Sequence, residues 1–255
     1  EEGRGAADTN KAAQEANAAA KEAGVRIFTQ TPLIGLTRSA QGRWLLRTPH
    51  GEITSSKVGL TTNAYGTQVI PARLRKSIVP ITSYAVASER LTKVQRAAVL
   101  PSGVNFSDTR RDPMFFRVDT EGRIITGGLV EPLRGRLTEH TFEGFTKRLT
   151  NLYPVLEGLK WTHHWSGTVG ISARQRPAIF ELEDGLWGLV GYSGRGVPTS
   201  AALGRAFAET LRDPAEGAKL WPAEAPARIV AGRAIGLAVQ GFRGPINKVR
   251  DRLES

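Results

Sequence analysis

Residues 185–211 read GLWGLVGYSGRGVPTSAALGRAFAETL and place a strand, a glycine turn and a helix in immediate succession. The opening run LWGLV is short and apolar, which is typical of a buried strand. After the turn, apolar side chains recur at helical spacing, at Ala201, Ala202, Leu203, Ala206, Phe207 and Leu211. Pro198 suits the first turn of this helix, and Thr199 or Ser200 can cap it. The stretch therefore predicts a strand–turn–helix unit.

The turn carries glycines at Gly191, Gly194 and Gly196, with the spacing Gly-x-x-Gly-x-Gly. Glycine lets a backbone come close to a flat or anionic ligand, and a helix start directs N–H groups and a partial positive charge at it. The nucleotide-binding fingerprint is instead Gly-x-Gly-x-x-Gly in the first βα turn. The stretch is thus not the diphosphate loop of an ordinary Rossmann unit. A tight connection without a ligand is the alternative interpretation.

Length and composition restrict the possible classes of protein. The 255 residues suggest one large or two modest domains, and 40% hydrophobic residues suffice for a core. The absence of cysteine excludes disulfides, thiolate metal sites and cysteine nucleophiles. No apolar run reaches the ~18 residues of a membrane span, and the polar start EEGRGAADTNK does not resemble a signal peptide. We therefore expect a soluble, cytoplasmic protein with no membrane span.

The chain is basic, with 35 Lys and Arg against 24 Asp and Glu, a net charge of +11. Nucleic-acid binding is one interpretation of this excess. However, the basic residues are scattered, without a basic stripe interleaved with aromatic residues. An anionic cofactor and carboxylate-bearing substrates explain part of the charge equally well. We therefore expect no nucleic-acid partner, and a basic nucleic-acid module remains an alternative.

The first part of the chain predicts a helix followed by short strands. Residues 3–8 imitate the start of a dinucleotide fingerprint, but no strand precedes them and Asp8 occupies the third glycine position. The alanine-rich residues 11–23 favour a helix that is closed by Gly24. Turn signals then separate five expected strands, at residues 25–28, 33–37, 44–48, 53–56 and 58–62.

Residues 185–211 closely resemble the C-terminal flavin-contact segment of the FAD-dependent amine and D-amino-acid oxidases. That family includes glycine and sarcosine oxidases and γ-glutamylputrescine oxidoreductase. The resemblance implies that the glycine turn lies against the isoalloxazine ring and that the helix start faces its N1–C2=O edge. It also implies FAD as the cofactor, bound non-covalently because no cysteine is present to attach it. The implied flavin-lining residues are Gly191, Tyr192, Ser193, Gly194, Arg195, Gly196 and Val197.

The order helix, strand, three-stranded meander, strand and TTNAY resembles the second part of the same family's FAD-binding domain. By this resemblance the backbone around Leu33 contacts adenine. Thr62, Asn63 and Ala64 would lie near the diphosphate side of the cofactor. Taken by itself, TTNAY also fits an ordinary strand exit.

The central residues 71–165 resemble the family's substrate domain, an antiparallel sheet with helices on one face. Residues 78–88, 114–118 and 123–127 are rich in β-formers, and residues 138–153 have the periodicity of an amphipathic helix. The expected fold is mixed α/β: an incomplete Rossmann-like FAD-binding domain with a three-stranded β-meander, plus an antiparallel substrate domain. The expected segments are 1–70, 71–165, 166–212, which returns to the FAD-binding domain, and a C-terminal tail or helix at 213–255.

Flavin-dependent amine oxidation needs few acidic or basic catalytic side chains, because flavin accepts the hydride and the protein supplies binding and orientation. A carboxylate-bearing substrate favours an arginine fork. Arg176 precedes a proline, as does the carboxylate-binding arginine of amino-acid-oxidising relatives, but the register between Arg174 and Arg176 is open. Arg117, on an expected strand of the substrate domain, is the third candidate, and a solvated surface role is the alternative for each. No catalytic residue is assigned.

His163 and His164 form the one adjacent histidine pair. Neighbouring residues of a strand point to opposite faces, so both cannot ligate one metal ion. We expect a structural role for them and no metal site.

The resemblance covers roughly residues 8–211 and begins in the middle of the family's FAD-binding domain. The strand, Gly-x-Gly-x-x-Gly and helix that bind the FAD diphosphate are not among the 255 residues. We therefore predict a fragment of an FAD-dependent oxidoreductase that oxidises the C–N bond of an amine or amino acid. A missing N-terminal segment or a second subunit is its implied partner. The alternative is a non-catalytic binding or subunit-interaction module that keeps the oxidase C-terminal fold.

Overall fold

The structure is a computed structural model that describes residues 9–108, 114–129, 139–232, 234–236 and 238. The chain forms two compact units. One, termed the split unit, comprises residues 9–80 and 168–233. The other, termed the inserted unit, is centred on residues 81–167. The chain passes from one unit to the other within strands β5 (Ile78–Arg90) and β9 (Trp161–Ser172).

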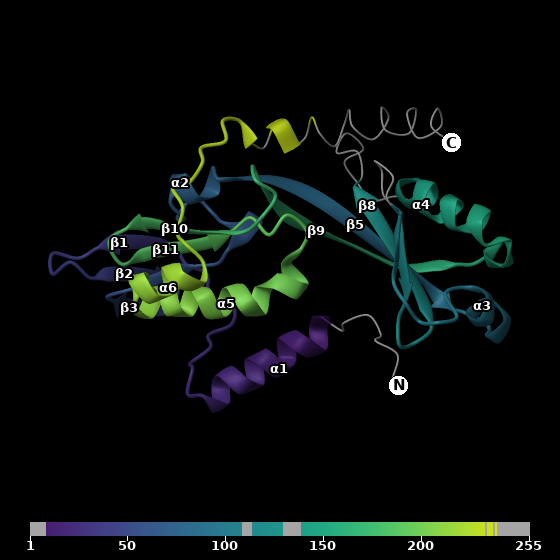
Figure 1. Ribbon diagram of the computed structural model, residues 1–255, viewed down its shortest axis with the longest axis horizontal. Helices are drawn as coiled ribbons and strands as arrows, with labels where there is room; N and C mark the ends of the chain where they lie inside the picture. The colour runs from purple at the N-terminus through teal and green to yellow at the C-terminus, as the bar shows by residue number, and fades with distance from the viewer. Residues whose placement is uncertain (1–8, 109–113, 130–138, 233, 237, 239–255) are drawn as a thin grey trace. The chain divides into compact units, whose positions relative to one another are not determined.

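The core of the split unit is a sheet in the order β10 (Ala178–Glu183), β11 (Leu186–Val190), β4 (Val58–Leu60). Strand β11 runs antiparallel to β10 and parallel to β4, and all of its residues are buried. The strand predicted from LWGLV is thereby confirmed. Helix α5 (Gly196–Arg212) lies alongside these strands (Figure 1), and Leu203, Ala206 and Phe207 form a buried cluster with sheet residues.

A second apolar cluster lies under the meander, which consists of β1 (Gly35–Arg38), β2 (Trp44–Thr48) and β3 (Gly51–Ser55) in consecutive antiparallel order. The predicted three-stranded meander is confirmed. Trp44 is buried in this cluster, and its indole N–H donates to the Asp184 carbonyl at 3.1 Å. Leu74 of the short helix α2 (Ala72–Arg75) belongs to the same cluster. The meander is thus fixed to the sheet by burial and by an indole hydrogen bond.

Helix α1 (Thr9–Glu22) forms as the alanine-rich pattern predicts. The helix ends at Glu22, and Gly24, just beyond it, has a φ of 82°. The N–H groups of Gly24 and Val25 donate to the carbonyls of Lys21 and Ala20, each at 2.9 Å, which is the Schellman ending of a helix. Within residues 12–22 of α1, every residue is exposed except Ala20, which is half-buried. Figure 1 shows α1 apart from the sheets of its unit.

The strand expected at residues 25–28 is not formed, and this prediction is wrong. A strand needs a partner for its main-chain groups. Among the described residues β4 pairs with β11 alone, and the segment 25–28 pairs with no strand. Val25, Ile27 and Phe28 are therefore left exposed although their side chains are apolar.

The inserted unit is built on an antiparallel sheet in the order β6 (Phe106–Ser107), β7 (Phe115–Val118), β8 (Arg123–Leu129), β5, β9. Helix α4 (Glu139–Leu152) contributes Leu149 to the core, where Phe116 and Ile124 of the sheet are buried as well. Helix α3 (Lys93–Ala98) begins with a capping box between Thr92 and Gln95. The predicted antiparallel sheet with an amphipathic helix is confirmed.

Short elements complete the described chain: the 3₁₀ turns η1 (Asn63–Tyr65) and η3 (Pro154–Leu156), and helix α6 (Pro214–Leu220). The C-terminal tail or helix expected at residues 213–255 falls partly outside the described residues. No helix in the described part of the chain is long and apolar enough to cross a membrane. The mixed α/β fold class predicted from the sequence is confirmed.

Candidate functional site

The glycine turn between β11 and α5 uses left-handed backbone conformations, with φ of 88° at Gly191, 52° at Ser193 and 82° at Gly194. A Cβ at Gly191 would lie 2.9 Å from the Cβ of Ser172, so this position needs glycine for space as well as for conformation. A Cβ at Gly194 would meet nothing within 4 Å. Gly194 is therefore required by its backbone alone.

Hydrogen bonds fix this turn to two other segments of the split unit. The Gly191 N–H donates to Oδ1 of Asn63 at 3.1 Å, across 128 positions in sequence. The Ser193 N–H donates to the Gly170 carbonyl at 3.0 Å, and the Ser172 N–H donates to Oγ of Ser193 at 3.2 Å. The structure thus brings together the glycine turn and the TTNAY turn, two of the segments that the resemblance assigns to the cofactor.

Helix α5 begins at Gly196, and no side chain caps its start. The predicted capping by Thr199 or Ser200 is wrong, because the N-cap position is Arg195, which is four residues before Thr199. Both hydroxyls lie within the first turns and donate back to carbonyls, Thr199 to Arg195 at 2.7 Å and Ser200 to Val197 at 3.3 Å. The main-chain N–H groups at the helix start are therefore left without a side-chain acceptor.

The side chains of Arg195, Tyr192 and Val197 in this turn have different environments. Nη1 of Arg195 donates to the Gln175 carbonyl at 3.0 Å, which ties the turn to the loop before β10. The Tyr192 side chain is half-buried against the cluster under α5, and this burial raises the pKa of its phenol. Val197 is exposed.

Thr62 and Ala64 belong to the TTNAY turn, and Leu33 packs on the same apolar cluster as Ala64. Leu33 and Ala64 are half-buried against the cluster that contains Trp44. The hydroxyl of Thr62 is buried and has no hydrogen-bond partner within the described chain. Such an unpaired group is costly, so it fits a site that a polar ligand completes.

The two arginines before β10 are both engaged by one carboxylate. Nη1 of Arg174 lies 2.9 Å from Oε2 of Glu224, and Nη2 of Arg176 pairs with Oε1 of the same side chain. The Arg176 guanidinium also lies 5.5 Å from the centroid of the Trp221 ring. The main chain of Glu224 forms an isolated parallel bridge with Phe180. Glu224 could not be predicted as their partner, since a lone acidic residue in a proline-rich stretch carries no local signal.

Arg117 belongs to the inserted unit and is described within it. Along β7, Phe116 and Val118 are buried in the core, so Phe115 and Arg117 lie on the opposite face of the strand. Phe115 is exposed and Arg117 is half-buried. No side chain of the described residues forms an ion pair or hydrogen bond with Arg117. Its guanidinium is therefore available to a ligand.

The two histidines make local contacts. Nδ1 of His163 lies 2.8 Å from Oγ1 of Thr162, and the His164 ring centroid lies 5.8 Å from that of Phe142. Within the described ranges, no three His, Cys, Asp or Glu residues are grouped so that they could hold a metal ion.

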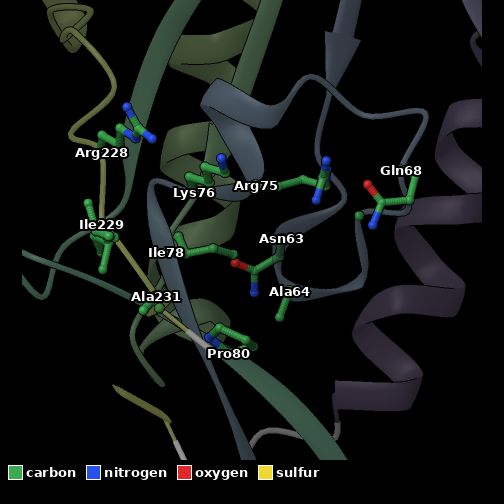
Figure 2. A pocket seen from close by; sticks show the side chains of 13 residues that line it. Asn63, Ala64, Gln68, Arg75, Lys76, Ile78, Pro80, Arg228, Ile229 and Ala231 are labelled. Atoms are coloured by element: carbon green, nitrogen blue, oxygen red, sulfur yellow. The ribbon is translucent and has the colours of Figure 1, made fainter. Parts of the chain in front are cut away.

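A pocket of about 410 Å³ adjoins the TTNAY turn within the split unit. Figure 2 shows Asn63 and Ala64 on its wall together with Arg75, Lys76 and Arg228. These three cations were not among the residues predicted from the sequence. The dipeptide Arg75-Lys76, just before the strand predicted at residues 78–88, was the available sequence signal for a cationic site. Arg228 lies far away in the sequence and is brought to the same pocket by the tertiary structure.

Comparison with known proteins identifies relatives of the chain. A family model described as "DAO: FAD dependent oxidoreductase" matches residues 1–210. γ-Glutamylputrescine oxidoreductase of Escherichia coli (strain K12) is 24% identical over 209 residues, which are 82% of this chain and 49% of the relative. A probable oxidoreductase OrdL of Rhizobium meliloti (strain 1021) is 27% identical over 187 residues, 73% of this chain and 42% of the relative. The chain thus spans about half the length of the curated relatives it matches.

Solved structures show the same fold at lower identity. L-proline dehydrogenase from P. horikoshii superposes with a TM-score of 0.68 and 20% identity, covering 81% of this chain and 56% of that one. Glycine oxidase from Bacillus cereus superposes with a TM-score of 0.63 and 17% identity, covering 82% and 55%. Since the family model matches residues 1–210 of the 255, the chain belongs to the DAO family of FAD-dependent oxidoreductases.

Proposed function

We propose that this chain forms the flavin-facing part of an oxidoreductase that oxidises the C–N bond of an amine or amino acid. The observation that carries the proposal is the hydrogen bond between Asn63 and Gly191. It joins two segments far apart in sequence, and each of them resembles a cofactor-contact segment of the family. The printed names of the relatives, which include γ-glutamylputrescine oxidoreductase and glycine oxidase, support the substrate class.

FAD, held non-covalently, is the proposed cofactor, and when bound it accepts the hydride. The turn from Gly191 to Val197 would lie along the ring system, where the uncapped start of α5 offers N–H groups and a partial positive charge. Thr62, Asn63 and Ala64 would lie beside the diphosphate, with Leu33 near adenine. The unpaired Thr62 hydroxyl fits a polar ligand on that side.

We further propose that a strand–glycine–helix unit completes the FAD site, supplied by the same polypeptide or by a second subunit. The exposed helix α1 and the apolar residues Val25, Ile27, Phe28 and Ile34 support this proposal, because they leave a surface of the split unit uncovered. Strand β4 has a partner on one side only among the described strands. A parallel strand added beside β4 would remove this exposed edge.

For the substrate we propose an amine with a carboxylate group. Of the three candidate arginines, Arg117 has a free guanidinium, whereas Arg174 and Arg176 already share Glu224. Phe115, on the same face of β7, offers an apolar surface beside Arg117. We therefore favour Arg117 as the residue that binds the substrate carboxylate.

The proposal is tested by Gly196→Val in the flavin-loaded protein assembled with the missing unit. A Cβ at Gly196 meets nothing closer than 3.7 Å, so the fold tolerates the change, but the side chain would project from the helix start that faces flavin. The variant is expected to lose flavin absorbance while keeping its circular dichroism spectrum. Gly204→Val on the exposed surface of α5 is the matched control, because a Cβ there meets nothing within 4 Å. If both variants retain flavin, the turn does not contact it. A colourless wild-type assembly that still forms a defined complex would favour the non-catalytic module instead.

A further inference from the structure

The pocket of about 410 Å³ lies entirely within the split unit, and three separate segments of that unit form it. They are the turn after β4, the end of α2 with the start of β5, and residues 228–232 of the C-terminal segment. Its volume is within the usual range for small-molecule sites. Figure 2 shows Ile78, Pro80 and Ile229 as apolar wall residues among the polar ones.

The charge of the pocket lining is of one sign. Arg75, Lys76 and Arg228 line the pocket, and none of the lining residues is acidic. Nε of Arg75 donates to the Ile70 carbonyl at 2.9 Å, which leaves its two terminal nitrogens available. Lys76 and Arg228 form no ion pair with any described residue. Like charges around one pocket repel one another, and a bound anion would relieve that repulsion.

Main-chain contacts hold the cationic residues around the pocket. The Ile229 N–H donates to the Lys76 carbonyl at 2.7 Å, which fixes the C-terminal segment beside the start of β5. A Cβ at Gly232 would lie 3.2 Å from the Ile78 carbonyl oxygen, so the segment continues in close contact with that strand. The positions of Lys76 and Arg228 are therefore set by backbone pairing and do not depend on their own side chains.

The pocket adjoins the proposed flavin contacts. Asn63 lines it and at the same time accepts the Gly191 N–H through its side-chain oxygen. Its amide nitrogen has no partner among the described residues and adds a neutral donor to the cationic ones. A ligand in the pocket would thus lie directly beside the segment that ties the glycine turn to the sheet.

We propose that this pocket is an oxyanion-binding site in which Arg75, Lys76 and Arg228 bind a phosphate or carboxylate group. The site does not require flavin, so its test is independent of the proposed oxidase activity. The oxyanion has two possible sources, a phosphate group of a nucleotide or the carboxylate of an organic acid. Both are bound by the same charge-assisted hydrogen bonds.

The experiment measures binding of two probes, inorganic pyrophosphate and glutarate, to the 255-residue chain by isothermal titration at matched ionic strength. Sodium chloride is added to bring all titrations to the same ionic strength, so that differences in charge screening do not contribute to the result. Lys76→Gln and Arg228→Gln are the test variants, because neither side chain supports the fold through an ion pair. Arg205→Gln is the control: it removes the same charge from an exposed position of α5.

The wild-type chain is expected to bind at least one probe, and each test variant is expected to weaken that binding about ten-fold. Arg205→Gln should leave the affinity unchanged. Binding of pyrophosphate alone identifies a phosphate source, and binding of glutarate identifies a carboxylate source. The proposal is overturned if neither probe binds, or if Arg205→Gln weakens binding as much as Lys76→Gln does.

Discussion

Asn63 meets two structural requirements at the proposed site, a left-handed backbone conformation and a hydrogen-bond acceptor. Its φ of 44° lies in the left-handed region, which asparagine tolerates better than most residues. Its Oδ1 is the acceptor for the N–H of Gly191, a buried residue. A replacement must therefore supply both the backbone conformation and the acceptor.

We predict that Asn63→Ala lowers the free energy of unfolding by about 1–3 kcal/mol, because the buried Gly191 N–H loses its acceptor. Asn63→Asp keeps an acceptor and a residue that tolerates this φ, and it should retain most of the stability. Urea unfolding of the two variants measures the difference. Equal loss in both would mean that the amide group, and not its oxygen, stabilises the turn.

Substrate recognition gives a second prediction at the residue scale. Arg117→Gln should raise KM for carboxylate-bearing amines about ten- to a hundred-fold, with little change for neutral amines, because a charge-assisted contact is lost. Arg176→Gln should change KM less, since its guanidinium is already paired with Glu224. Steady-state kinetics of the assembled protein compares the two. The opposite order would assign the carboxylate to the arginines before β10.

At the scale of elements, prediction from sequence succeeded where local pattern and tertiary environment agree. The run LWGLV is a strand because β10 and β4 flank it on both sides. Residues 25–28 also have a β pattern and form no strand, since no described strand pairs with them. The start of α5 was misplaced because Gly196 and Val197 carry no capping signal, yet the helix begins there. The ion pair between Arg176 and Glu224 joins residues 48 positions apart in the sequence, so no local pattern could predict it.

The uncovered elements of the split unit give a prediction about self-association. Phe28 is 61% exposed and Ile34 is 55% exposed, and both follow the exposed helix α1. Large apolar side chains that a fold leaves exposed favour association. Phe28→Ser combined with Ile34→Thr should lower the apparent mass of the isolated chain in sedimentation. Val94→Thr is the control, because Val94 is 70% exposed but stands on α3 of the inserted unit. Self-association that survives the double substitution must use another surface.

At the scale of the whole molecule, the contacts proposed for FAD are distributed unevenly. The isoalloxazine and adenine contacts map onto the split unit, from the Gly191–Val197 turn to Leu33. The principal diphosphate contact of the family requires a helix start with a glycine loop, which supplies N–H donors and a favourable dipole. That unit is not among these residues, so the described chain offers only part of the binding free energy.

We therefore predict that residues 1–255 alone bind FAD weakly and do not oxidise amines. Adding the strand–glycine–helix unit, fused or as a second chain, should restore both properties, because it supplies the diphosphate donors and covers β4 and α1 together. Flavin fluorescence measures binding, and peroxide production or dye reduction with several amines measures turnover. A variant of the added unit with its first glycine replaced by valine is the control for the diphosphate loop. Tight, stoichiometric FAD binding with turnover by the isolated chain would contradict the prediction. It would also locate the diphosphate among the residues described here, and Lys76→Gln would then test whether the cationic pocket is that place.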